Sequence, residues 1–166
     1  MTVTSVIKDP EAMTLAIVAD FDAPPTRVWR VWADPRELER WWGPPTYPAT
    51  FVDHDLSVGA RCTYLMTGPG EYQPHGWWRI RSVNPPHDLE FENGFAHDNF
   101  APDDTMPVSI IRVTLDERVN GGTVMTITTS FASAQAMDRL ISMGMAEGMS
   151  AAMGQIDDVV AETATS

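Results

Sequence analysis

The candidate proton-transfer side chains in this sequence are Tyr64, His54 and His75. A general acid or base works best when it titrates near the working pH and lies within hydrogen-bond reach of its substrate. His54 stands in the triplet Asp53-His54-Asp55, and His75 precedes Gly76-Trp77-Trp78. These three side chains are candidates for acid–base catalysis, but the sequence assigns no catalytic residue among them.

The triplet Asp53-His54-Asp55 also resembles a set of metal ligands. Side chains alternate between the two faces of a strand, so His54 points away from both aspartates and the three cannot hold one ion. Cys62 is the only cysteine, which excludes an internal disulfide and a cysteine-based zinc site. Phosphate-binding loops, zinc-protease motifs and calcium loops are absent from the sequence. We therefore predict no metal and no cofactor.

Composition predicts a globular chain with an acidic surface. Its 166 residues are 43% hydrophobic and 20% charged, with a formal net charge of −12. This charge argues against binding to nucleic acid or to anionic membranes, both of which attract basic proteins. The N-terminus lacks the apolar run of a signal peptide, and no stretch is long enough to span a membrane. We expect one domain over residues 1–166, with its core at about 12–162, in the cytoplasm.

Alternation and turn signals predict an α+β chain with seven strands. The expected strands cover residues 13–21, 49–56, 60–67, 74–83, 88–93, 107–117 and 122–131. Two short helices follow the first strand, because Pro24-Pro25 and Asp34-Pro35 are typical helix starts. Residues 133–164 show the apolar spacing of one long helix that begins at Ser133. Successive hairpins predict an antiparallel sheet, and the long helix should pack across it.

Large flexible apolar side chains are unusually frequent, with 6 Trp and 10 Met. Methionine adapts to varied apolar partners, and Tyr or Trp adds a polar group that seeks a hydrogen bond when buried. We predict that these residues line a ligand cavity between the sheet and the last helix, although a filled core is the open alternative. The predicted lining residues are Trp42, Tyr64, Met66, Trp78, Phe91, Met125, Met145 and Met149.

Several segments together resemble a known family. They are residues 21–29, Asp34-Pro35, residues 38–44, residues 55–60, Gly76, Asn84-Pro85-Pro86 and residues 144–160. In this order and spacing, over about residues 12–162, they resemble the AHSA-like proteins, which are homologues of an activator of a heat-shock chaperone ATPase. That family belongs to the START-like, or SRPBCC, superfamily. Gly148-Met149 stands where the family usually has Gly-Trp, which implies a larger or softer pocket here.

The resemblance implies a helix-grip fold, in which a seven-stranded curved antiparallel sheet surrounds a long C-terminal helix. It also implies a cavity that superfamily members use to bind lipids, hormones or polyketides, or to cyclise or dehydrate them. Our main hypothesis is binding of a small apolar or aromatic molecule. The alternatives are a cyclase, dehydratase or hydrolase acting in the same cavity, and a chaperone-regulating interaction module. The sequence leaves open whether the chain forms a homodimer.

Overall fold

The computed structural model describes residues 2–70 and 73–163. Its elements in chain order are β1 (Thr2–Asp9), β2 (Thr14–Phe21), α1 (Pro25–Ala33), α2 (Pro35–Leu38), β3 (Ala49–Asp53), β4 (Arg61–Met66), β5 (His75–Asn84), β6 (Asp88–Ala96), β7 (Ser109–Glu117), β8 (Thr123–Ser130), α3 (Ala134–Ser142), α4 (Met145–Met153) and α5 (Ile156–Thr163). The predicted α+β class is confirmed, and the curved antiparallel sheet with a C-terminal helical segment is consistent with a helix-grip fold.

The sheet has eight described strands rather than the seven predicted, in the order β1-β2-β8-β7-β6-β5-β4-β3. The additional strand is β1, which pairs antiparallel with β2 at one edge of the sheet. The predicted alternation in β2 is confirmed, because Leu15, Ile17, Ala19 and Phe21 are all buried. Strand β2 pairs in turn with β8, and this brings the beginning of the chain next to the last strand.

The two short helices begin where the prolines predict. Asp34 caps α2, and its side-chain carboxylate accepts a hydrogen bond from the Arg36 amide at 2.9 Å. Arg27 in α1 donates to the Glu37 carboxylate at 2.9 Å and to the Val159 carbonyl of α5 at 3.0 Å. Helices α1, α2 and α5 are therefore joined by one network of hydrogen bonds and ion pairs.

The predicted long C-terminal helix is divided into three. Gly144 adopts a φ of +87° between α3 and α4, a left-handed conformation that suits glycine and ends a right-handed helix. A second break separates α4 from α5 at Gly154 and Gln155, and Gln155 donates to the Gly43 carbonyl at 2.8 Å. The last residue of the predicted helix, 164, lies outside the described residues.

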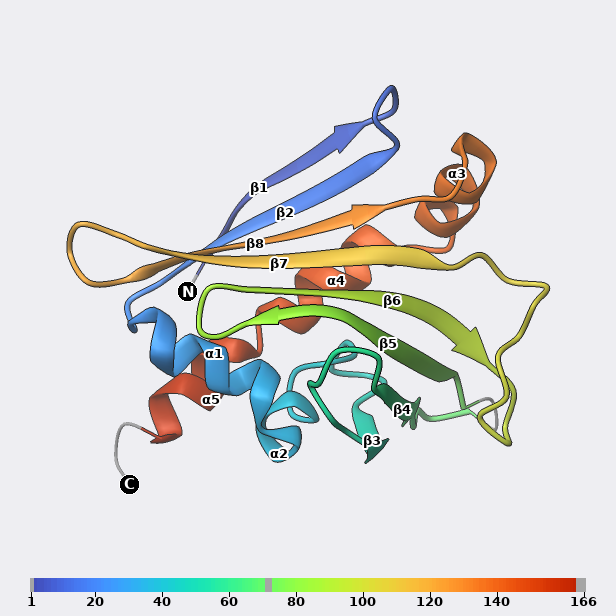
Figure 1. Cartoon of the computed structure of the whole chain (residues 1–166), viewed down its shortest axis with the longest axis horizontal. Helices are drawn as coiled ribbons and strands as arrows, with labels where there is room; N and C mark the ends of the chain where they lie inside the picture. Colours follow the sequence, from blue (N-terminus) through green and yellow to red (C-terminus); the bar gives the residue numbers. More distant parts are fainter. Residues whose placement is uncertain (1, 71–72, 164–166) are drawn as a thin grey trace.

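Most of the core lies between the concave face of the sheet and the helices. Figure 1 shows α4 passing behind the sheet and α5 lying next to α1. An aromatic cluster of five buried rings fills one part of this space: Trp32, Trp41, Trp42, Trp78 and Phe91. The rings of Trp78 and Phe91 are stacked with centroids 4.1 Å apart. Within the described residues, no helix is long and apolar enough to cross a membrane.

Candidate functional site

A pocket of about 220 Å³ lies between the sheet and α4. An engineered protein cavity of about 150 Å³ accommodates benzene, so this volume suits a molecule of one or two rings. We call it the sheet–α4 pocket. Its wall consists of Trp42, Gly43, Pro44, Tyr64, Met66, Asn93, Phe95, Ser109, Ile111, Thr129, Leu140, Met145, Gly148, Met149 and Ala152.

Helix α4 contributes one face to the pocket. Met145, Gly148, Met149 and Ala152 are spaced at i, i+3, i+4 and i+7, which places them on one side of a helix. A Cβ atom added at Gly148 would have no neighbour within 4 Å. The glycine therefore leaves space on the pocket side of α4.

Tyr64 forms part of the opposite wall, and a glycine on the next strand positions its ring. Tyr64 in β4 pairs with Gly76 in β5, and a Cβ at Gly76 would lie 2.3 Å from the tyrosine ring. The Tyr64 hydroxyl donates to Asn93 Oδ1 at 3.1 Å. Burial raises the pKa of Tyr64 to about 12, an effect that the neighbouring Trp42 only partly opposes. The phenol is therefore protonated and neutral at ordinary pH.

Five of the eight predicted lining residues lie on the pocket wall, namely Trp42, Tyr64, Met66, Met145 and Met149. The other three, Trp78, Phe91 and Met125, face inward but are completely buried in the neighbouring core. Trp78 and Phe91 belong to the aromatic cluster, where other rings occupy the space in front of them. Alternation predicted the correct face for these residues but not their position relative to the helices.

Neither histidine candidate reaches the pocket. His54 follows β3, and its Nε2 lies 3.0 Å from the Trp32 carbonyl oxygen. Burial lowers the pKa of His54, although that hydrogen bond and the nearby Asp34 and Asp55 act in the opposite direction. His75 begins β5 and is half-buried, and its Nδ1 lies 2.6 Å from the Gln73 carbonyl oxygen.

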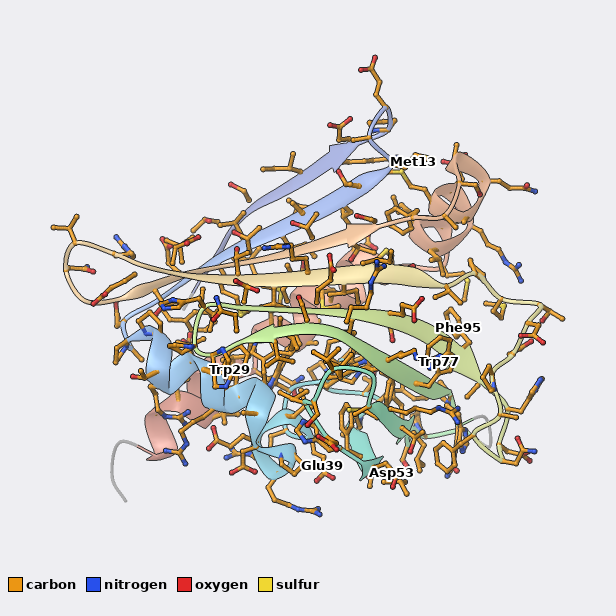
Figure 2. All side chains as sticks on the ribbon, in the orientation of Figure 1. Met13, Trp29, Glu39, Asp53, Trp77 and Phe95 are labelled. Atoms are coloured by element: carbon orange, nitrogen blue, oxygen red, sulfur yellow. The ribbon has the colours of Figure 1, made fainter. Side chains whose placement is uncertain are left out.

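The Asp53-His54-Asp55 triplet does not form a metal site. Asp53 accepts a hydrogen bond from Thr63 at 3.0 Å, whereas Asp55 accepts one from Ser57 at 2.7 Å. Figure 2 shows Asp53 on the side of the molecule far from α3. Among the residues that the structure describes, no group of three or more His, Cys, Asp or Glu side chains could hold a metal ion.

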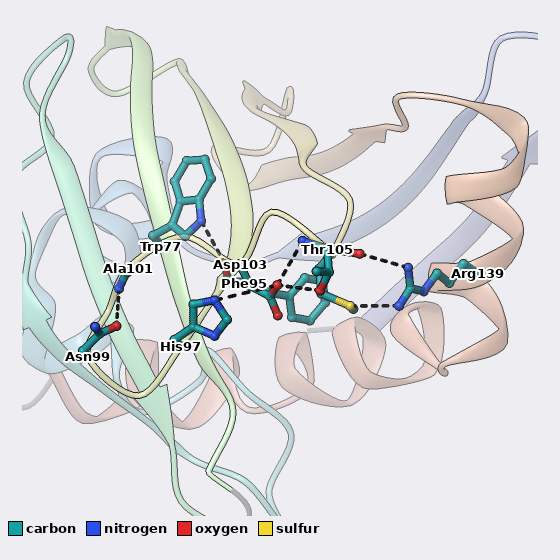
Figure 3. Close-up of polar contacts among 9 residues, drawn as sticks. Trp77, Phe95, His97, Asn99, Ala101, Asp103, Thr105 and Arg139 are labelled. Carbon is teal, nitrogen blue, oxygen red and sulfur yellow. Dashed lines mark hydrogen bonds and ion pairs between the residues drawn. The ribbon is translucent and has the colours of Figure 1, made fainter.

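The residues of the acidic loop between β6 and β7 do not line the pocket. Hydrogen bonds hold this loop against the sheet and α3, as Figure 3 shows. The Asp103 amide donates to the Phe95 carbonyl at 2.9 Å, and Arg139 donates to the Thr105 carbonyl at 3.3 Å. Two hydrogen bonds from Thr105 are the main cause of the lowered pKa of Asp103.

Comparison with known proteins places this architecture in a family. Residues 22–161 match the family described as Activator of Hsp90 ATPase homolog 1-like protein. The chain belongs to that family. A comparison with curated proteins returned no match.

Two similar solved structures are of proteins from Arthrobacter aurescens and Mycobacterium smegmatis. The first, a solution NMR structure, is 48% identical over 97% of this chain and 93% of the other, with a TM-score of 0.92. The second, a crystal structure, is 47% identical over 95% and 96%, with a TM-score of 0.87. A solution NMR structure of a Staphylococcus epidermidis protein shares the fold at 22% identity and a TM-score of 0.80, covering 98% and 95% of the two chains.

In this Activator of Hsp90 ATPase homolog 1-like chain, our sequence reasoning missed the polar residues of the pocket. Asn93, Ser109 and Thr129 lie on three adjacent strands and line the wall opposite α4. The alternation of the strands in the sequence already indicated two of these three residues. Asn93 is two residues after Phe91 and Thr129 is two residues after Ile127, so each shares the inward face of its neighbour.

Proposed function

We propose that this protein binds a small apolar or aromatic molecule in the sheet–α4 pocket. The observation that carries the proposal is the pocket itself, with its space in front of Gly148 and its wall of Met, Trp and Phe side chains. Burial of apolar ligand surface contributes about 25 cal/mol per Å² before the costs of ordering the complex are subtracted. Because the pocket volume is about 220 Å³, only a compact ligand can bury its surface there.

Catalysis in the same pocket has less support. Within the described part of the chain, Tyr64 is the only lining residue with an ionisable side chain. Its pKa of about 12 is far above the range in which a general base is effective near neutral pH. Both histidine candidates lie outside the pocket. The arrangement therefore favours binding over proton transfer.

A chaperone-regulating role would predict a large apolar surface patch. The exposed large apolar side chains come instead from separate elements, including Val6 and Ile7 at one sheet edge and Val52 at the other. We therefore do not extend the family description to a chaperone partner for this chain.

Two measurements of ligand binding test the proposal, and a variant that blocks the pocket then locates the binding site. Native mass spectrometry of freshly purified protein should reveal a co-purified small molecule, and a thermal-shift screen of aromatic compounds should find ligands that raise Tm. At a ligand concentration of 100 Kd, stabilisation is about 2.7 kcal/mol, or roughly 5–10 °C for a domain of this size.

Gly148→Leu should abolish this shift, because the new side chain occupies the pocket. Ala151→Leu is the matched control, since Ala151 lies on the exposed side of α4 and does not line the pocket. The control should retain the full shift. An equal shift in both variants would show that the compounds bind elsewhere, and a screen without any ligand would argue against the proposed function.

A further inference from the structure

A row of neutral polar side chains crosses the concave wall of the pocket. We call Asn93, Ser109 and Thr129 the polar stripe. Asn93 in β6 pairs directly with Ser109 in β7, and Thr129 in β8 pairs with Ile111, two residues after Ser109. Ser109 is 5% exposed and Thr129 is 3% exposed. The stripe is therefore a buried feature of the pocket wall and not part of the solvated surface.

The polar stripe has unused hydrogen-bonding capacity. Asn93 Oδ1 accepts from the Tyr64 hydroxyl, which leaves the amide nitrogen of Asn93 available as a donor. The hydroxyls of Ser109 and Thr129 make no hydrogen bond to any residue that the structure describes. Buried polar side chains in folded proteins almost always have a partner. Here the group that could supply one is a molecule in the pocket.

The indole nitrogen of Trp42 is also buried in the pocket wall, and its interaction with the Tyr64 hydroxyl opposes the rise of the tyrosine pKa. Trp42 lies on the pocket wall and is 4% exposed. The groups available to a ligand are therefore the amide N–H donors of Asn93 and the two hydroxyls of Ser109 and Thr129, which can also donate. This excess of donors matches a ligand that carries a hydrogen-bond acceptor.

The pocket wall also lacks charge. None of the lining residues is Asp, Glu, Lys, Arg or His. The one ionisable group, Tyr64, is held in its neutral form by burial. A charged ligand group placed here would lose its hydration without gaining an ionic partner, which is costly. The wall therefore favours an uncharged acceptor, such as a ketone carbonyl, over a carboxylate or an amine.

We propose that the ligand is an uncharged one- or two-ring molecule whose carbonyl oxygen accepts hydrogen bonds from Asn93 and Ser109 of the polar stripe. This inference rests on the proposed binding function and specifies the chemical class of the ligand. The rings would lie against Met145, Met149 and Phe95. The hydrogen bonds from Asn93 and Ser109 would then replace those that the carbonyl oxygen makes with water before binding.

Three probes of nearly equal size test the inference, with dissociation constants measured by NMR titration of isotope-labelled protein. Acetophenone carries a carbonyl, ethylbenzene lacks it, and benzoate replaces it with a charge. A purely apolar cavity would prefer ethylbenzene, because a carbonyl must lose its hydration. We expect acetophenone to bind at least as tightly as ethylbenzene, and benzoate to bind most weakly.

Ser109→Ala should weaken acetophenone binding about fivefold and leave ethylbenzene binding unchanged, since one neutral hydrogen bond contributes about that factor. Asn93→Leu should have a similar or larger effect. Thr128→Ala is the matched control, because its hydroxyl is on the opposite face of the same strand as Thr129. Melting temperatures of the unliganded variants establish that each is folded.

Preference for ethylbenzene, or equal losses for both probes in Ser109→Ala, would overturn this inference while leaving the binding function intact. Tightest binding of benzoate would overturn the uncharged class. Failure of all three probes to bind would overturn both this inference and the proposed function.

Discussion

The aromatic cluster and the sheet–α4 pocket are adjacent regions of one interface, yet the first is filled and the second is open. Strand β6 contributes inward-facing residues to both. Phe91 is stacked on Trp78 in the cluster, whereas Asn93, two residues further along β6, faces the pocket. Two residues of a strand span about 6.6 Å, so the transition from filled to open core is abrupt.

The two regions differ in the side chains that face the sheet. Opposite the sheet, the cluster presents the rigid rings of Trp32 in α1 and of Trp41 and Trp42 after α2. The rings of Trp32 and Trp42 meet that of Trp78 at 42° and 85°, and together they fill the space. The helical side of the pocket presents Met145, Gly148 and Met149. A flexible side chain or a missing one leaves volume where a ring would occupy it. The comparison teaches that the pocket results from a local choice of residues on α4.

The largest expected difference between the regions is in stability. Trp78→Ala should reduce the free energy of unfolding by about 3–5 kcal/mol, because it leaves a cavity among packed rings. Met149→Ala should cost about 1 kcal/mol, since Met149 is only partly buried and already borders open space. Urea denaturation measures both values. Equal losses would mean that the pocket wall is packed as tightly as the cluster.

The next effect concerns the ion pairs that hold the helices at the filled end. Glu37 lies 2.9 Å from Arg27 and 3.0 Å from Arg30, and its side chain is 10% exposed. Glu37→Gln should destabilise the protein by roughly 3 kcal/mol, because two guanidinium groups lose their carboxylate. The exposed pair of Arg118 and Asp20, 3.6 Å apart, is the control. Arg118→Gln should cost less than about 1 kcal/mol.

Replacing each of two glycines beside the pocket by alanine should change the stability of the protein in opposite directions. Gly144→Ala should destabilise by roughly 1–2 kcal/mol, because its left-handed backbone disfavours a side chain. Gly148→Ala should stabilise by about 1 kcal/mol, because alanine is the better helix former and the added methyl meets no atom. Thermal unfolding of the two variants compares them directly. Stabilisation by both would show that the break between α3 and α4 is not fixed by Gly144.

The smallest expected effect is a pH dependence outside the pocket. Burial lowers the pKa of His54 below the ordinary histidine value of 6.5. In acid the unfolded chain therefore binds more protons at this residue than the folded one. The resulting contribution to stability is complete above about pH 6.5 and is lost as the pH falls through the lowered pKa. His54→Gln should flatten the stability profile on the acidic side of pH 6.5. An unchanged profile would contradict the lowered pKa.

Sequence reasoning predicted the α+β class, the hairpin order and the inward face of most strands, because alternation and turn residues are local signals. It missed β1, whose strand-forming residues Val3, Val6 and Ile7 are followed by a turn that ends on Met13 with a φ of +57°. Such a backbone conformation is unusual for methionine and gives no sequence signal. The division of the C-terminal helix likewise depends on a left-handed Gly144, which lies within the apolar spacing of the continuous helix predicted over residues 133–164.

The candidate site was partly predictable for a related reason. Periodicity identifies the residues on an inward face, but it does not say which of them a helix covers. Trp78, Phe91 and Met125 therefore could not be separated from Tyr64 and Met66 in advance. The polar residues were missed because we searched for titratable side chains, whereas an amide and two hydroxyls give the pocket its polarity.

The interruptions on either side of α4 have an evolutionary consequence. Of its nine residues, only Ala152 and Met153 are buried, while the folding core relies on α1, α5 and the sheet. Substitutions at Met145, Gly148 and Met149 can therefore change the shape of the sheet–α4 pocket while the folded core stays intact. Sequence changes confined to this one short helix would let related proteins bind different ligands while they keep the same fold.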